Sequence, residues 1–550
     1  MSTGDDATDT ASAPRLYRDP WWAWAALLLI LGFAAFVRIR LIDLPLERDE
    51  GEYAYAGQLL LQGIPPYDIA YNMKLPGTYA AYALIMGIFG QTTGGIHLGL
   101  IVINSLNIVL VYFLGRSLFG RICGVVGAAS FALLSLSDSV FGLAAHATHF
   151  VTLFATAGAL CLWHYMRNAR PGLLFWSGLL MGISFLMKQQ AIFFVAFGAV
   201  MVLVHEFKRP SPQMRNVVLR AALFGVGAAL PFFIACILLA FAGVFPRFWF
   251  WTFSYARQYA SFIPYSLGLL YLEHEILNLL RSAPVLWILF VVACVFVWLH
   301  ARERQAALFA GALLCAAFAS ACPGLFFREH YFIPMLPAVG IFLGAAVQII
   351  SDQDLTGRKF KWETGATVVL LLGAFGQAVL RHQALFFHLS PDAAARYIYG
   401  NNPFPESPQI ARYIREHSKP EDRIAVLGSE PQIYFYSRRH SATGYIYIYP
   451  LMEPQKYAAT MQGEMIAQIE TARPEFIVFV NVPASWLAQP NSSRAIFSWV
   501  EGFCPRYYRS VGLVETGYKE ASIPRWGDRA VAAIPRSDTF VRVFQRNDLF

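Results

Sequence analysis

Residues 21–53 read WWAWAALLLILGFAAFVRIRLIDLPLERDEGEY, and this stretch decides the fold. Its first twenty or so residues are almost entirely apolar, which is about the length of helix that crosses roughly 30 Å of hydrocarbon. Charged side chains then follow within a few residues. The stretch therefore predicts a membrane-spanning helix that leads directly into a polar loop at one membrane surface.

The composition of the whole chain extends this interpretation. Of 550 residues, 57% are hydrophobic and only 14% are charged, whereas soluble domains carry about 25% charged residues. The net charge of +8 comes from Lys and Arg beside apolar segments, where such residues set membrane topology. We therefore expect a polytopic α-helical membrane protein in contact with lipid, and no nucleic-acid partner.

Apolar runs of spanning length recur along the chain, and we count about eleven. They lie near 21–41, 96–115, 121–138, 148–166, 171–187, 190–207, 217–243, 284–300, 305–321, 331–350 and 364–380. This pattern predicts a transmembrane domain over 21–380, whose long first external loop covers 42–95.

The loops between these runs alternate in positive charge. The basic ones contain Arg116 and Arg121; Arg167 and Arg170; Lys208, Arg209, Arg215 and Arg220; Arg302 and Arg304; and Arg358, Lys359 and Lys361. Basic loops stay in the cytoplasm. We therefore expect residues 1–20 to form a disordered cytoplasmic tail and the carboxyl terminus to lie outside.

From residue 381 the composition becomes that of a soluble domain. RIAVLG (423–428) and FIVFVN (476–481) have the β-branched character of strands, and helical patterns cover 407–418 and 455–473. We predict a small extracytoplasmic α/β domain over 381–550.

The first external loop concentrates ionisable groups. Asp49 and Glu50 are adjacent, Tyr53 follows one turn later, and Lys74 stands in KLPG. Such a cluster at a membrane surface indicates a functional site. The structural alternative is a capping box from Asp49 to Glu52 that starts a helix through Leu61.

With these motifs the chain resembles membrane glycosyltransferases of the GT-C fold. The similarity is greatest to the family of protein O-mannosyltransferases and lipid A aminoarabinose transferases, glycosyltransferase family 39. Asp49, Glu50 and Tyr53 match its acidic motif, and KLPG matches its Lys-Pro motif. Lys188 between two spans and REHYFIPMLP (328–337), with Arg328, His330 and Tyr331, also stand where the family has comparable residues.

The resemblance implies transfer of a sugar from a polyprenyl-phosphate donor to a lipid, glycan or protein acceptor, on the outer face of a bacterial plasma membrane. Asp49 would be the general base, with Glu50 orienting it or the acceptor. The donor phosphate would be bound by cations, since these stabilise a leaving oxyanion. The candidates are Lys74, Arg328, His330, Arg257 and Lys188, while Tyr53 and Tyr331 would contact substrate. For Arg257 and Arg328 the alternative is snorkelling into the headgroup layer.

The chain departs from the family at two places. Glu52 stands where aminoarabinose transferases have Arg, which argues against that sugar. The second external loop has His146 and His149 around Thr148 in place of a second carboxylate, which argues against a metal bridged by two acids. The two histidines are spaced to bind a metal or phosphate, or to form interfacial hydrogen bonds. We assign no metal ligands and no cofactor, and a divalent metal stays open.

Three other functions compete with this one. A transporter or lipid flippase would usually place charges inside spans and repeat its spans, and neither feature is evident here. An oligosaccharyltransferase would use a similar lipid donor but move a whole glycan. A membrane-tethered binding protein would not need so many spans.

Overall fold

The computed structural model describes residues 19–352, 362–517, 523–531 and 533–547. The predicted tail over 1–20, except its last two residues, lies outside the described residues. So does the last basic set, Arg358, Lys359 and Lys361.

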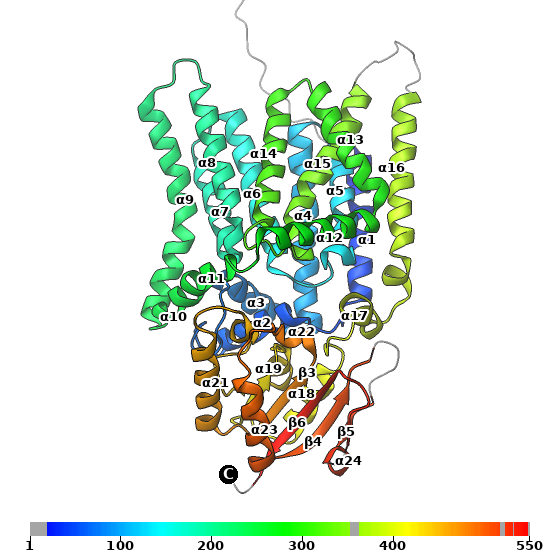
Figure 1. The fold of residues 1–550 in the computed structure, drawn as a ribbon. Coiled ribbons are helices and arrows are strands. Elements are labelled where there is room, and N and C mark those ends of the chain that lie inside the picture. Colours follow the sequence, from blue (N-terminus) through cyan, green and yellow to red (C-terminus); the bar gives the residue numbers. More distant parts are fainter. Residues whose placement is uncertain (1–18, 353–361, 518–522, 532, 548–550) are drawn as a thin grey trace, which may run out of the picture.

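A helix runs through each of the eleven predicted apolar segments, and together these helices form an elongated bundle (Figure 1). They are α1 (Trp21–Arg40), α4 (Thr93–Leu118), α5 (Arg121–Leu134), α6 (Ala147–Asn168), α7 (Gly172–Met187), α8 (Ile192–Phe207), α9 (Met214–Phe241), α13 (Pro284–His300), α14 (Arg304–Ala321), α15 (Leu336–Asp352) and α16 (Trp362–Arg381). The prediction of a polytopic helical protein is confirmed.

The lengths and apolar character of the helices support fewer membrane crossings than the eleven predicted. In the described part of the chain, seven helical segments are long and apolar enough to cross a membrane, or eight if a bent pair is counted as one span. α5 and α7 have only 14 and 16 residues, which is shorter than the usual span of about 17–25. Eleven crossings therefore stay a prediction.

The two long segments between the predicted spans, 42–95 and 244–283, are largely helical. The loop 42–95 folds as α2 (Arg48–Leu61) and α3 (Pro76–Phe89). The segment 244–283 forms α10 (Phe245–Trp249), the π-helical segment η3 (Phe250–Tyr255), α11 (Ala256–Ala260) and α12 (Tyr265–Ser282). α12 bends by 109° into α13 and lies across the bundle (Figure 1).

The C-terminal region is a small α/β domain, as predicted. Its helices are α17 (Pro391–Tyr399), α18 (Ser407–Glu416), α19 (Gln432–Ser437), α20 (Tyr449–Met452), α21 (Ala458–Ala472), α22 (Pro483–Trp486), α23 (Ala495–Tyr507) and α24 (Asp528–Val531). Its strands are β1 (Arg423–Leu427), β2 (His440–Ser441), β3 (Phe476–Asn481), β4 (Tyr508–Glu515), β5 (Arg525–Trp526) and β6 (Phe540–Arg546). The sheet order is β2-β1-β3-β6-β4-β5; β1 pairs in parallel with β2 and β3, and the other pairs are antiparallel.

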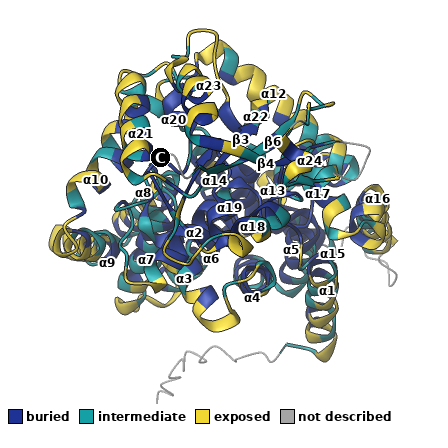
Figure 2. Ribbon diagram, turned by 90° about the horizontal axis from the view of Figure 1, so that it is seen from below, coloured by how far each residue is buried: buried dark blue, intermediate teal, exposed yellow. Residues whose placement is uncertain are grey.

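The C-terminal domain packs directly on α2. Arg48 forms a buried ion pair with Glu430 at 2.6 Å, and the Tyr55 ring stacks on Tyr434 with centroids 5.2 Å apart. Gly51 lies so close to α19 that a methyl group added to it would come within 2.5 Å of the Gln432 backbone nitrogen. Figure 2 shows α2 and α19 near the buried centre, whereas the outer helices α1, α9 and α16 expose much of their surface. The helix α2 is thus enclosed between the bundle and the domain.

The basic loops gather at the other end of the bundle (Figure 1). Arg167 pairs with Glu303 at 3.1 Å, and both line one cavity with Phe119 and Arg302. These loops therefore share one face, as the charge pattern predicts. Which face is cytoplasmic stays a prediction.

Candidate active site

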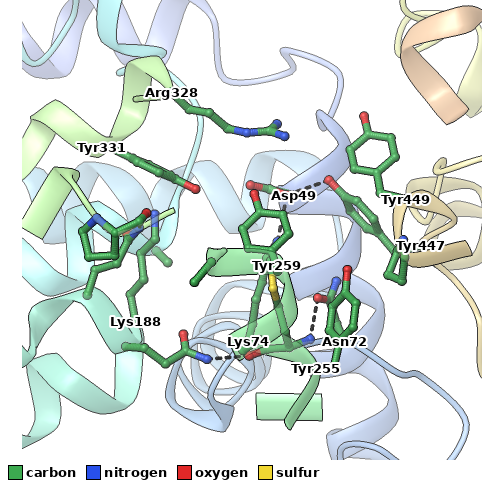
Figure 3. Close-up of a pocket in the computed structure, with 18 of the residues that line it drawn as sticks. Asp49, Asn72, Lys74, Lys188, Tyr255, Tyr259, Arg328, Tyr331, Tyr447 and Tyr449 are labelled. Carbon is green, nitrogen blue, oxygen red and sulfur yellow. Dashed lines mark hydrogen bonds and ion pairs between the residues drawn. The ribbon is translucent and has the colours of Figure 1, made fainter. Parts of the chain in front are cut away.

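A pocket of about 180 Å³ lies where the membrane bundle, the first external loop and the C-terminal domain meet (Figure 3). Its walls come from α2, residues 72–74, the turn at 187–190, η3 and α11, the segment η4 (Glu329–Met335) with the residue before it, and residues 447–453. Seven of the predicted site residues line it: Asp49, Tyr53, Lys74, Lys188, Arg328, His330 and Tyr331. Segments far apart in sequence thus converge on one small volume.

The start of α2 explains why Asp49 is available to this pocket. The capping box is formed by Glu47 as N-cap and Glu50 as N3, each side chain accepting the other residue's backbone N–H. The predicted box from Asp49 to Glu52 is therefore wrong, although the helix does run through Leu61. Because Glu47 caps the helix, the Asp49 carboxylate has no capping role and points into the pocket.

Lys74 joins two carboxylates on one face of α2. Its Nζ lies 2.8 Å from Asp49 Oδ1 and 2.8 Å from Glu52 Oε2, and the Tyr79 hydroxyl donates to Glu52 Oε1 at 2.6 Å. Burial disfavours the charged form of Asp49, but the ion pair with Lys74 outweighs it and holds the pKa of this carboxyl well below its usual range. Asp49 is therefore ionised at neutral pH, as a general base must be.

The two oxygens of Asp49 face different groups. Oδ1 also accepts a hydrogen bond from the Tyr447 hydroxyl at 3.1 Å. Oδ2 faces two imidazoles: His146 Nδ1 and His330 Nε2 each lie 4.0 Å away. The two rings stack on each other with centroids 4.1 Å apart and planes 8° from parallel. Burial lowers the pKa of His146 to about 4, so that this ring is neutral.

Asp49, His146 and His330 are metal-ligand types, with ligand atoms within 4.8 Å of one another. Both ring nitrogens of His146 and Nδ1 of His330 are buried without a hydrogen-bond partner in the described part of the chain. Their arrangement nevertheless does not fit a formed metal centre. Ligand atoms about 2.0–2.1 Å from a tetrahedral ion lie closer together than 4.0 Å, and two parallel stacked rings cannot both direct a lone pair at one ion. We therefore assign no metal to these three side chains.

Two cations in the pocket lack an acidic partner. Within the described residues, no carboxylate lies within ion-pairing distance of Arg328 or Lys188. Lys188 Nζ lies 3.6 Å from the centroid of the Tyr331 ring. Burial lowers the pKa of Lys188 well below its usual range. An anion in the pocket would restore its charge and would also meet Arg328, whose guanidinium points toward Asp49 (Figure 3).

Two predicted site residues lie outside the pocket lining. Glu50 is fully buried, accepts the Ala145 backbone N–H at 2.6 Å and pairs with His97 at 3.1 Å. It thereby connects α2 to the second external loop and to α4, which fits the predicted orienting role rather than contact with substrate. Arg257 is exposed on α11, while Tyr259 of the same helix lines the pocket. Its exposure fits the snorkelling alternative.

Several residues in or beside the pocket were not predicted; Glu52 lies beside it, where it pairs with Lys74. Glu52 is three residues after Asp49, so that both reach Lys74 from one helix face; this spacing was visible in the sequence. Tyr447, Tyr449 and Glu453 come from the C-terminal domain, and no motif marks them.

Comparisons with known proteins agree with this architecture. Residues 74–234 match the family model described as dolichyl-phosphate-mannose-protein mannosyltransferase. The crystal structure of ArnT from Cupriavidus metallidurans bound to undecaprenyl phosphate superimposes with a TM-score of 0.58 at 16% identity, over 95% of this chain and 98% of that one. No curated protein sequence matches the chain.

An oligosaccharyltransferase has the same architecture. The apo structure of the enzyme from Archaeoglobus fulgidus gives a TM-score of 0.53 at 12% identity, over 94% of this chain and 76% of that one. The structure of the oligosaccharyltransferase AglB from Archaeoglobus fulgidus in complex with an inhibitory peptide and a dolichol-phosphate gives a TM-score of 0.52 at 11% identity. That comparison covers 96% of this chain and 76% of that one. The chain therefore has the GT-C fold of membrane glycosyltransferases, as the sequence motifs predicted.

Proposed function

We propose that this protein is a polyprenyl-phosphate-dependent glycosyltransferase that moves a sugar to a lipid, glycan or protein acceptor at the outer face of a bacterial plasma membrane. One observation carries the proposal: a small pocket combines an ionised carboxylate, Asp49, with two basic side chains, Arg328 and Lys188, that lack an acidic partner among the described residues. Solved structures of the same fold hold undecaprenyl phosphate or a dolichol-phosphate, which supports this donor class.

Each part of the pocket then has a chemical task. Asp49 accepts the proton of the acceptor hydroxyl as the acceptor oxygen bonds to the anomeric carbon. The bond from that carbon to the phosphate oxygen breaks, and its electron pair leaves with the polyprenyl phosphate. Arg328 and Lys188 stabilise the charge that develops there. Lys74 keeps Asp49 ionised and oriented, so its role differs from the phosphate contact that the sequence predicted.

The test is transfer of radiolabelled sugar from polyprenyl-phosphate donors in membranes that contain the wild type or a variant at matched expression. We expect Asp49→Asn to lower the rate by about 10²–10⁴-fold and Arg328→Ala by about 10²-fold. Arg257→Ala is the matched control, because it removes an exposed Arg outside the pocket, and it should transfer normally.

Full activity in Asp49→Asn would reduce that residue to a structural role. If the wild type transferred no sugar from any donor offered, including lipid-linked oligosaccharides, the transporter or flippase hypothesis would replace the enzyme. Transfer from oligosaccharide donors alone would make the protein an oligosaccharyltransferase.

A further inference from the structure

The C-terminal domain closes one side of the pocket with the segment from Tyr447 to Glu453. The short helix α20 within it is firmly held: Leu451 and Met452 are fully buried, the Tyr449 hydroxyl donates to the Ala484 carbonyl at 2.6 Å, and the Ile448 N–H donates to Ser429 Oγ at 2.9 Å. Leu451 and Met452 belong to an apolar cluster that also includes Trp251 and Tyr255 of the membrane domain. This wall is therefore a fixed part of the site.

Glu453 is the last residue of this segment. Its carboxyl group lines the pocket together with that of Asp49. Its Oε2 accepts a short hydrogen bond from the Tyr255 hydroxyl of η3, while no described residue donates a hydrogen bond to Oε1. Asp49, by contrast, is occupied on one oxygen by both Lys74 and Tyr447. Each carboxyl thus keeps one oxygen without a donor among the described residues: Oδ2 of Asp49, which the proposed function assigns to the acceptor hydroxyl, and Oε1 of Glu453, which is left for another ligand group.

The position of Glu453 fits the sugar rather than the phosphate of a donor. Arg328 and Glu453 line the same pocket of about 180 Å³, so a phosphate held by Arg328 would place its attached sugar in the space that Glu453 borders. The rings of Tyr255, Tyr259, Tyr447 and Tyr449 also line this part of the pocket (Figure 3). Aromatic rings and one hydrogen-bonding carboxyl suit a hexose, which has apolar faces and a hydroxyl rim.

We propose that Glu453 is a specificity-determining residue that accepts a hydrogen bond from one hydroxyl group of the donor sugar. This inference rests on the proposed function and adds to it a sugar-reading role for the C-terminal domain. A site built to bind a hydroxyl strongly rejects the analogue that lacks it, because the protein's polar group is then left without its partner.

The competing explanation is that Glu453 only connects the domain to the bundle through Tyr255. Two variants separate these roles. Glu453→Gln has nearly the same shape but removes the carboxylate, whereas Tyr255→Phe removes the hydrogen bond between the domains and keeps the carboxyl group.

The experiment compares kcat/KM for donors made from undecaprenyl phosphate and glucose, mannose or galactose, followed by the monodeoxy analogues of the hexose that the wild type transfers. The wild type should reject one of these analogues. At pH 8.5, where the Glu453 carboxyl is ionised, the discrimination against that one analogue should fall by about 10- to 100-fold in Glu453→Gln, the loss expected for a hydrogen bond to a charged group. Tyr255→Phe should keep the wild-type ratio whatever its rate.

Unchanged ratios in Glu453→Gln, or an equal loss in Tyr255→Phe, would overturn the sugar-reading role and leave the glycosyltransferase proposal intact. Absence of transfer from every donor by the wild type would overturn both. Melting temperatures of the purified variants show whether each remains folded.

Discussion

Charged residues in and beside the pocket fall into two groups according to their partners. Asp49, Glu52 and Lys74 satisfy one another, with both ion pairs at 2.8 Å. Arg328 and Lys188 have no such partner among the described residues. A buried pair that loses one member leaves an uncompensated charge, which costs about 3–5 kcal/mol. Substitutions in the first group should therefore affect both folding and rate, and substitutions in the second mainly the rate.

Lys74→Ala tests the first group through the pH profile of transfer. Without Lys74, burial and the neighbouring Glu52 should raise the pKa of Asp49. The variant should then lose activity progressively as the pH falls below neutrality, whereas the wild-type base stays ionised. Lys456→Ala, an exposed lysine outside the pocket, is the control. A Lys74→Ala profile parallel to that of the wild type would contradict the assigned role.

Glu453 should make stability depend on pH. Burial raises the pKa of Glu453 to about 7, above its value of about 4.3 in an unfolded chain. Between these values the folded state binds more protons, so stability falls as the pH rises. Glu453→Gln lacks this titrating group and does not lose stability in this way. The melting temperature of the variant minus that of the wild type should therefore be larger at pH 8.5 than at pH 5. Equal differences at the two pH values would refute this pKa.

Metal removal is a further test at this scale. Lys74 already compensates the charge of Asp49, and the stacked rings of His146 and His330 do not converge on one point. We expect transfer to survive EDTA. The contrary result would be that EDTA abolishes transfer and Mn²⁺ restores it. Calorimetry would then show that His146→Ala loses metal binding, whereas the neighbouring buried His149→Ala keeps it. In that case the imidazoles must reorient around an ion.

The element on which the site depends most is α2. One face carries Asp49 to the pocket and Glu52 to Lys74, and another receives the C-terminal domain through Arg48, Gly51 and Tyr55. Any change in how the domain packs should therefore move Asp49 relative to Tyr447. Activity and domain packing are coupled through this single helix.

Gly51→Ala tests that coupling. The added methyl group would come within 2.5 Å of the backbone of α19, so the domain must shift. We expect a lower melting temperature, faster cleavage between the bundle and the domain by an added protease, and slower transfer. Gly87→Ala in α3 is the matched control, since its nearest neighbour is 3.9 Å away, and it should behave like the wild type or slightly better. Normal behaviour of Gly51→Ala would mean that α19 adapts without cost.

The sequence predicted these elements unequally, for physical reasons. Apolar runs and the strands at 423–428 and 476–481 are local signals, and each is present in the structure. The helices of segment 244–283 are short or lie across the bundle (Figure 1), so no apolar run of spanning length marks them. Glu453 and Tyr447 could not be predicted, since they reach the site only through packing between residues about four hundred positions apart.

The whole molecule has two chemically different ends, and their sidedness is testable. The basic loops lie at one end and the pocket and C-terminal domain at the other (Figure 1). Cysteines introduced at exposed Ser211 and Glu421 mark the two ends. In intact cells a membrane-impermeant maleimide should label Glu421→Cys but not Ser211→Cys, with the wild type as background. The reverse labelling would invert the proposed orientation.

The ion pair between Arg48 and Glu430 joins residues 382 positions apart, and this separation sets the order of biosynthesis. The ribosome makes α2 among the first helices, yet the groups that cover it are synthesised only after the whole bundle. The nascent protein therefore carries Asp49 without Tyr447 or Glu453 until its last third has been translocated. A chain that stops early lacks the residues 447–453 that complete the pocket, so under the proposed function we expect an incomplete product to leave the lipid-linked sugar untouched.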